Sequence, residues 1–167
     1  MAQHFPALTA VVSPPQFAPE FAVGQRRVGP RYPAFLIAEA GVAHFGDIAL
    51  GRQLVELAAA AQADAFKLQV FDVEQMIARR AVQWRDRLRP RTLAFDQVRE
   101  MRELCRERNL EFILTAHDES KIEWLERLDV AAVKIGSGER NNPAFLRKLA
   151  ALERPIILST GMYVEAD

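Results

Sequence analysis

Two lysines stand inside short apolar segments of the chain, Lys67 within residues 65–70 and Lys134 within residues 131–135. A lysine inside a sheet is costly to desolvate, so each needs a carboxylate, a ligand anion or water as its partner. At about 4 Å and an effective dielectric constant near 20, one lysine contributes on the order of 4 kcal/mol of Coulomb attraction to an anion. The pair therefore indicates a site for a phosphorylated acid.

Other apolar segments also end in polar side chains. Because the side chains of a strand alternate between two faces, Lys67 and Gln69 share one face, opposite to three apolar neighbours. The segments around 35–39, 111–115 and 155–159 end in further polar groups, which are Glu39, Thr115 and Ser159. Parallel α/β enzymes place their sites at the C-terminal ends of strands. The pattern predicts that these groups converge there.

A glycine-rich loop, Gly136-Ser137-Gly138-Glu139, follows Lys134. Its glycines allow backbone N–H groups to turn toward an anion, and Ser137 adds a hydroxyl donor. A purely structural reading stays open at this point, because Lys67 and Lys134 can instead form ion pairs with Glu39 and Glu139.

Two histidines and an arginine-rich stretch allow weaker interpretations. His44 and His117 follow the first and third segments, but no carboxylate or cysteine stands at the usual spacing of metal ligands, and we predict no metal ligand in this chain. Residues 79–91 carry several arginines around Trp84, a pattern typical of a solvated loop that can reach the far end of a substrate. The stretch is too short and too mixed to indicate a nucleic-acid interface.

The elements that would carry these groups alternate regularly. Helical periodicity follows Asp47, with Leu50, Leu54, Leu57, Ala58 and Ala61 on one face, and spans 96–108, where Val98, Met101 and Cys105 point inward. Further helices follow Asp118 and begin at Asn142-Pro143. We expect five strands and four helices of an α/β protein. Parallel strands with right-handed crossovers are compatible with either a doubly wound sheet or a barrel.

Composition and charge exclude several classes of protein. The chain has 167 residues, half of them apolar, and 22 basic residues balance 22 acidic ones. No global field therefore favours nucleic acid or a membrane surface, and no apolar run reaches the roughly 20 residues of a membrane span. The single cysteine, Cys105, suits a core thiol and a reducing, cytoplasmic location. Proline-rich residues 1–20 predict a flexible tail, residues 21–34 a hairpin, and residues 35–167 the main domain.

The motifs also occur in a recognisable order. They are Ile37-Ala38-Glu39-Ala40-Gly41, His44, Gly46-Asp47, Lys67-Leu68-Gln69, Lys134-Ile135-Gly136-Ser137-Gly138-Glu139, Asn141-Asn142 and Leu158-Ser159-Thr160-Gly161-Met162. From about Phe21 to Met162 the chain resembles the N-acetylneuraminate (sialic acid) synthase family, which includes legionaminic and pseudaminic acid synthases. The resemblance implies a (β/α)8 TIM-type barrel, incomplete in this chain. It also implies condensation of phosphoenolpyruvate with an N-acetyl amino sugar, such as N-acetylmannosamine, to a nine-carbon 2-keto acid and phosphate.

The resemblance further implies roles for individual residues. Around the phosphate and carboxylate of phosphoenolpyruvate it places Lys67, Thr115, Lys134, Ser137 and Ser159. Glu39 becomes the acid/base or electrostatic group beside the reacting carbons, with Gln69 and Glu139 lining the same cavity. A divalent metal (Mn or Mg) is implied, with ligands on later strands outside this chain. The family also implies a homodimer for a full-length form, in which a small antifreeze-like domain reaches the partner's site.

Two departures from the family pattern bear on the sugar. Ala43 stands where asparagine is usual, and Ala116-His117 replaces a common proline and aromatic. We expect the isolated chain to carry the phosphoenolpyruvate half of the site and little activity. Two alternatives remain: a truncated, non-catalytic relative that binds an anion or a full-length synthase, and a phosphoenolpyruvate-condensing enzyme that makes a different keto sugar acid.

Overall fold

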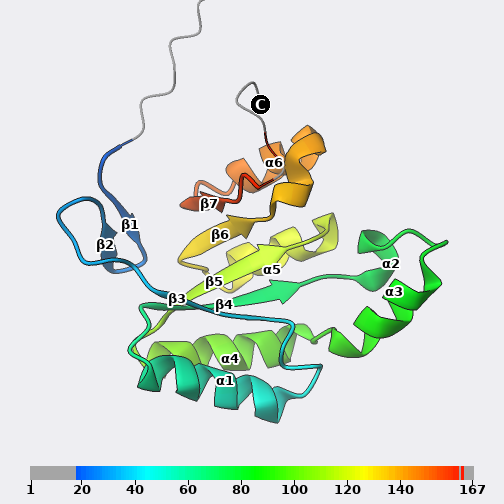
Figure 1. Cartoon of the computed structure of the whole chain (residues 1–167), viewed down its shortest axis with the longest axis horizontal. Helices are drawn as coiled ribbons and strands as arrows, with labels where there is room; N and C mark the ends of the chain where they lie inside the picture. The colour runs from blue at the N-terminus through cyan, green and yellow to red at the C-terminus, as the bar shows by residue number, and fades with distance from the viewer. Residues whose placement is uncertain (1–17, 162, 164–167) are drawn as a thin grey trace, which may run out of the picture.

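A computed structural model of the chain describes residues 18–161 and 163. Most of the tail predicted for 1–20 lies outside these residues. Five strands form one parallel sheet in the order β3-β4-β5-β6-β7 (Figure 1). Their bounds are β3 Ile37–Gly41, β4 Ala65–Val70, β5 Glu111–Ala116, β6 Ala132–Ile135 and β7 Ile156–Leu158. The strands of the sheet thus follow the order of the sequence, without the reversal that defines a doubly wound sheet.

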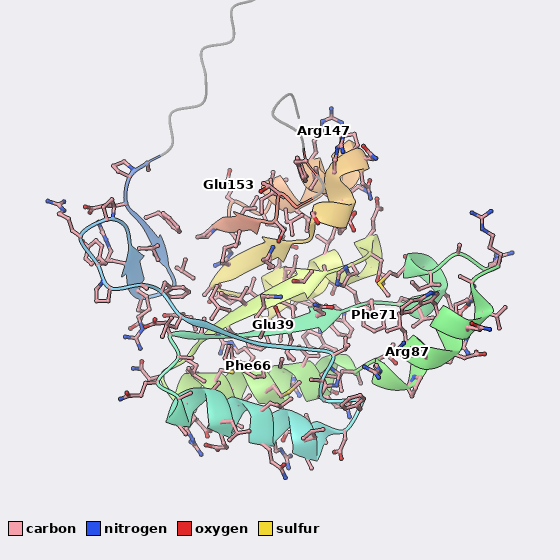
Figure 2. All side chains as sticks on the ribbon, viewed as in Figure 1. Glu39, Phe66, Phe71, Arg87, Arg147 and Glu153 are labelled. Carbon is pink, nitrogen blue, oxygen red and sulfur yellow. The ribbon has the colours of Figure 1, made fainter. Side chains whose placement is uncertain are left out.

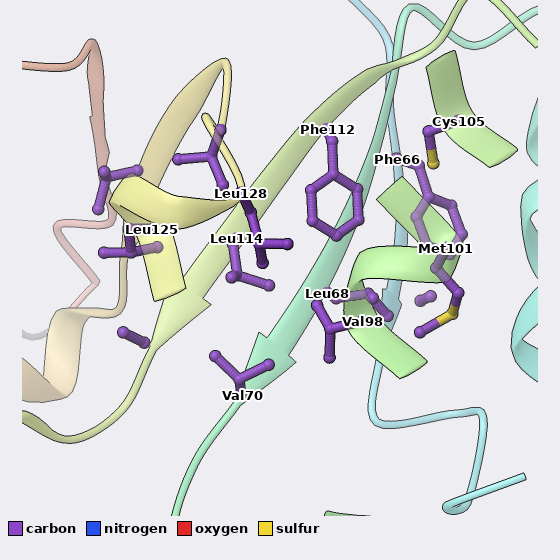
Figure 3. Close-up of a cluster of buried hydrophobic side chains, with 14 of the residues drawn as sticks. Phe66, Leu68, Val70, Val98, Met101, Cys105, Phe112, Leu114, Leu125 and Leu128 are labelled. Atoms are coloured by element: carbon purple, nitrogen blue, oxygen red, sulfur yellow. The ribbon is translucent and has the colours of Figure 1, made fainter. Parts of the chain in front are cut away.

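Four helices connect these strands, as expected. They are α1 Ile48–Ala60, α4 Phe95–Glu107, α5 Ile122–Arg127 and α6 Pro143–Ala150. Their buried side chains all join one core cluster, together with Phe66, Leu68, Phe112 and Leu114 of the sheet (Figure 3). The helices therefore cover one face only, and with the sequential strand order this makes the domain the first part of a TIM-type barrel, which confirms the predicted fold class.

Additional short helices interrupt the connections. The link between β4 and α4 contains α2 (Val73–Met76), α3 (Val82–Leu88) and the 3-10 turn η1 (Arg89–Arg91), which the sequence pattern did not predict. Further 3-10 turns precede α5 and α6, namely η2 (Glu119–Lys121) and η3 (Ser137–Asn141). Figure 1 shows α2 and α3 extending beyond the C-terminal end of β4. The arginine-rich stretch therefore lies at the end of the sheet where the polar groups were predicted.

The predicted hairpin is present and covers the opposite end of the sheet. β1 (Phe21–Val23) pairs antiparallel with β2 (Arg26–Val28), and Gly24 takes the left-handed conformation (φ 59°) in the turn. Val23 is buried against Ala65, Ile113 and Ala132, which are inward residues near the starts of three strands. The hairpin thus packs on the helix-free face at the N-terminal ends of the strands.

Several predicted helix ends are also correct. The Asp47 side chain accepts hydrogen bonds from the backbone N–H groups of Ala49 (2.8 Å) and Leu50 (3.4 Å), as an N-cap should. Asn142 caps α6 through Phe145 (3.3 Å). Beyond α4, Asn109 takes a left-handed conformation (φ 57°), which ends the helix.

The face predicted for α1 is correct only in part, because Ala58 is buried and Leu54 packs against the core but Leu57 does not. The buried residues of α1 are Gly51, Val55 and Ala58, whereas Leu57 is 64% exposed. The reason is the contact with α4: a Cβ at Gly51 would lie 2.6 Å from the Met101 sulfur, so glycine allows this side of α1 to approach α4 closely. The predicted leucine side of α1 instead borders a shallow groove beside the β3 edge, lined by Ala38, Leu54, Leu57 and Ala61 among others.

Candidate functional site

The inner, helix-free face of the sheet carries an ion pair between β3 and β4. Glu39 and Lys67 are register partners on these strands, and the Lys67 ammonium group forms an ion pair with the Glu39 carboxylate. The side chain of Lys67 is only 8% exposed, whereas that of Glu39 is 47% exposed. Figure 2 shows Glu39 on the side of the sheet away from Phe66, which lies toward α1 and α4. The first of the two predicted structural ion pairs is therefore present.

Lys134 has a different environment. Its ammonium group donates to the Ser159 hydroxyl at the end of β7 and to the Ile135 carbonyl (2.7 Å). Partial burial lowers the pKa of Lys134, and repulsion from Lys67 lowers it further, while Glu39 opposes both effects. Within residues 18–161 and 163, no carboxylate forms an ion pair with Lys134. The second predicted ion pair, between Lys134 and Glu139, is therefore absent.

Thr115 lies on β5, between the two strands that carry Lys67 and Lys134. It pairs in register with Gln69, is 3% exposed, and its Oγ1 atom is buried without a hydrogen-bond partner in the described part of the chain. Leaving a buried hydroxyl unpaired costs about 1–3 kcal/mol, so such a group calls for an explanation. A ligand oxygen on the inner face would supply the missing partner.

The loop after β6 forms the 3-10 turn η3, which carries Ser137 and Glu139. Glu139 accepts a hydrogen bond from the Asn142 amide (3.2 Å) and acts electrostatically on His117. The backbone of this loop does not require glycine, because Gly136 has φ −74° and a Cβ would find nothing within 4 Å at Gly136 or Gly138. Any side chain could adopt this backbone. Of the donors predicted in this loop, the Ser137 hydroxyl remains a candidate.

One residue of this face was not assigned a role by the sequence pattern. His117 follows β5, and its backbone N–H donates to the Val70 carbonyl (3.0 Å), which extends the pairing with β4 by one residue. The alternation of β5 therefore continues through Ile113, Thr115 and His117. The His117 Nε2 atom lies 3.3 Å from the Gln69 Oε1 atom. Extending the alternation by two residues beyond the predicted strand end at Thr115 would have found it.

The structure thus brings Glu39, Lys67, Gln69 and Thr115 together with Lys134 and Ser159 on one face. Among the described residues, Lys67 is paired with the Glu39 carboxylate and Lys134 with none, so the Lys134 ammonium group lies beside the Ser159 hydroxyl without a countercharge of its own. The donor set suits an anionic ligand. By contrast, a cavity of about 480 Å³ lined by Arg102, Arg106 and Arg154 lies at the N-terminal ends of the strands, away from these groups.

His44 lies in a different environment from His117. His44 is fully buried, and its Nδ1 atom accepts from the Gly46 N–H (3.0 Å). Among residues 18–161 and 163, no three His, Cys, Asp or Glu side chains are placed to hold a metal ion.

The same residues include no helix that is long and apolar enough to span a membrane.

Fold and geometry together define a TIM-type α/β domain whose inward lysines and hydroxyls lie toward the C-terminal ends of its strands. Residues 54–167 match the model of the NeuB family. The chain is 32% identical over 149 residues to human N-acetylneuraminate-9-phosphate synthase, and 33% identical over 141 residues to N,N'-diacetyllegionaminic acid synthase of Legionella pneumophila. The chain belongs to the NeuB family, whose members include synthases of sialic acid type.

A solved structure extends the similarity to 88% of the chain. The sialic acid synthetase of Leptospira borgpetersenii, in complex with citrate, superposes with a TM-score of 0.84 at 27% identity and covers 88% of this chain. This chain covers 51% of that protein. It likewise spans 42% of the human protein and 40% of the Legionella protein, while 82% and 77% of this chain are aligned. The chain therefore spans about half or less of the length of these relatives.

Proposed function

We propose that the protein containing this chain condenses phosphoenolpyruvate with the open-chain aldehyde of an N-acetyl amino sugar, giving a nine-carbon 2-keto sugar acid and phosphate. Membership of the NeuB family supports the reaction class. The observation that carries the proposal is the arrangement of Lys67 and Lys134 around a single paired carboxylate, next to the unpartnered Thr115 hydroxyl. This arrangement suits a ligand with both a phosphate and a carboxylate.

In this reaction, C3 of phosphoenolpyruvate forms a bond to the aldehyde carbon, whose oxygen takes a proton and becomes a hydroxyl. Water adds at C2, and the C2–O bond to phosphate then breaks to leave a ketone and free phosphate. Lys67 and Lys134 hold the negative charge of the substrate and of the intermediate. Glu39 is positioned by Lys67, and as the more exposed partner it can hold or move a proton at the reacting carbons.

The remaining groups bind the substrates. Thr115, Ser137 and Ser159 donate hydrogen bonds to phosphate and carboxylate oxygens, and Gln69 and Glu139 line the space for the sugar. The family resemblance implies Mn²⁺ or Mg²⁺, but the described residues provide no group of three ligands for it. The roles proposed for the described side chains are substrate binding, charge stabilisation and proton transfer. A homodimer remains a prediction for the full-length form.

The test compares Lys134→Met with Lys148→Met in the full-length protein. Lys134 faces the inner side of the sheet, whereas Lys148 pairs with Glu119 on the surface and serves as the matched control. Hydrogen bonds to charged groups contribute about 1.5–3 kcal/mol, so we expect Lys134→Met to weaken phosphoenolpyruvate binding by about 10- to 150-fold. Isothermal titration calorimetry measures the affinity, and circular dichroism checks the fold.

Activity is measured as phosphate and keto acid released from phosphoenolpyruvate with N-acetylmannosamine and related aldehyde sugars. Wild-type protein that binds phosphoenolpyruvate but releases neither product with any of these sugars would contradict the condensation and favour a non-catalytic relative. Equal affinity in wild type and Lys134→Met would contradict the anion site itself. Product formed only with another aldehyde would favour a different keto sugar acid.

A further inference from the structure

His117 occupies a fixed position beside the candidate site. Its backbone pairs with Val70 (3.0 Å), so its imidazole follows Ile113 and Thr115 on the inner face of the sheet. The ring also meets Phe71 edge-on, with 6.4 Å between the ring centroids. The imidazole is thus held by the backbone of β5 and by an aromatic neighbour.

The hydrogen bond to Gln69 defines the tautomer of this histidine. Gln69 Oε1 only accepts, so its contact with His117 Nε2, 3.3 Å away, is a hydrogen bond in the tautomer that carries the proton on Nε2. Burial lowers the pKa of His117, as does Lys67, whereas Glu139, Asp118 and Glu39 act in the opposite direction. The neutral Nε2–H form is therefore the expected state near pH 7.

The same hydrogen bond sets the direction of the Gln69 amide nitrogen. With Oε1 turned to His117, the amide nitrogen turns toward β3. A Cβ built on Gly41 would lie 3.4 Å from Gln69 Nε2 and 3.1 Å from Glu39 Oε1. Gly41 has φ 52° and stands at a register shift between β3 and β4. The absence of a side chain at Gly41 therefore leaves space where the amide and the Glu39 carboxylate converge.

We propose that His117 is a positioning residue, which holds the Gln69 amide so that its NH2 group donates to a carbonyl or hydroxyl oxygen of the acceptor sugar beside Glu39. The inference rests on the proposed function. Because Lys134, Thr115 and Ser159 hold the anion independently, His117 acts on the acceptor and not on phosphoenolpyruvate.

The experiment uses full-length protein with two substitutions. His117→Phe keeps the ring and its contact with Phe71 but loses the donor, whereas His117→Gln places an N–H near the position of Nε2. A neutral hydrogen bond of ordinary strength corresponds to about a 5- to 10-fold effect. We expect His117→Phe to raise the KM for the acceptor sugar by this factor, with phosphoenolpyruvate affinity unchanged, and His117→Gln to restore most of it.

A double-mutant cycle separates positioning from general structural damage. If His117 acts through Gln69, His117→Phe has no further effect in a Gln69→Ala background. An equal loss in both backgrounds, an unchanged acceptor KM in His117→Phe, or a parallel loss of phosphoenolpyruvate affinity would each overturn the proposal.

A spectroscopic measurement distinguishes this proposal from the proposed function. Imidazole ¹⁵N shifts report the tautomer of His117 whether or not the protein condenses sugars. We expect the Nε2–H form at pH 7.5 in wild type and a changed Nε2 shift in Gln69→Ala. If the spectrum is as expected but the protein does not condense sugars, the proposed function and the role of His117 toward the acceptor sugar are wrong, and the contact between His117 and Gln69 stands. An Nδ1–H spectrum would overturn that contact itself.

Discussion

The Thr115 hydroxyl is a single polar group whose burial costs stability. It is buried and has no partner in the described residues, although its β-branched side chain suits the strand. Valine has nearly the same shape without the polar atom. Replacing an unsatisfied hydroxyl removes its desolvation penalty, so the substitution relieves a cost at this position.

We therefore predict that Thr115→Val raises the free energy of unfolding by about 1 kcal/mol while it weakens phosphoenolpyruvate binding. Urea denaturation and calorimetric titration measure the two quantities on the same preparation. The matched control is Thr92→Val, because Thr92 is exposed and its hydroxyl bonds only to the local Arg89 carbonyl (2.9 Å). A loss of stability in Thr115→Val would mean that the hydroxyl already has a partner.

His44 links stability to pH. It is fully buried, its Nδ1 accepts from Gly46, and its Nε2 has no partner among the described residues. Burial lowers the pKa of His44 from its ordinary value of 6.5, and Arg91 lowers it further. The unfolded chain therefore binds the proton more readily than the folded one. The contribution is fully present above about pH 6.5 and is lost as the pH falls toward the folded-state pKa.

Because the unfolded chain binds this proton more readily, we predict that the free energy of unfolding of the wild-type protein falls between pH 6.5 and 5. One such group lowers it by up to about 1.4 kcal/mol per pH unit. His44→Asn retains an acceptor for the Gly46 N–H but does not titrate, so its loss over this range should be smaller. His117→Gln serves as the parallel variant, because burial also lowers the pKa of His117. Identical slopes in wild type and His44→Asn would contradict the prediction.

At the scale of the elements, the start of α1 depends on one side chain. Asp47 satisfies the N–H groups of Ala49 and Leu50, which have no partner within the helix. The loop before this cap carries His44 and Phe45.

We predict that Asp47→Ala lowers the free energy of unfolding by about 1 kcal/mol and that Asp47→Ser retains most of it, because serine also caps. Thermal and urea denaturation measure the difference. The loop lies away from Lys134 and Ser159, so phosphoenolpyruvate affinity should change little. Equal stability of the alanine and serine variants would show that α1 is positioned by α4 alone.

The rotation of α1 shows where periodicity is insufficient. The leucines of this helix formed a regular stripe, yet the buried side runs through Gly51 and Val55. Periodicity detects apolar residues, and glycine contributes nothing to it. The decisive feature is close contact with Met101 of α4, which depends on the distance between the two helices.

On the scale of the whole molecule, the sheet has two strands with one neighbour each. β3 and β7 end the order of the described sheet. Leu36 and Leu57 are 55% and 64% exposed near the β3 edge, and Ile156 and Leu158 are 42% and 43% exposed on β7. Open strand edges with exposed apolar side chains favour association with other chains.

We predict that residues 1–167, prepared as an isolated polypeptide, self-associate at micromolar concentrations. Analytical ultracentrifugation measures the association, and Leu158→Lys should reduce it because a charged residue opposes pairing at an edge. Arg127→Lys, on the surface of α5, is the control for a change away from the edges. A monodisperse monomer at all concentrations would contradict the prediction.

The sequence by itself determined the alternation of strands and helices, the caps at Asp47 and Asn142, the common face of Lys67 and Gln69, and the position of Thr115 at a strand end. These features follow from local rules, namely periodicity, capping and side-chain alternation. The family motifs followed from the order of residues along the chain, since no contact is needed to recognise them.

Only the tertiary structure decided which groups meet. It paired Lys67 with Glu39 but Lys134 with Ser159, turned α1 toward α4, and joined His117 to Gln69. It also showed that the strands run in sequence order with all four helices on one face, which selects the barrel over the doubly wound sheet. The physical reason is that pairing, register and helix approach depend on distances between segments far apart in the chain, which local patterns do not contain.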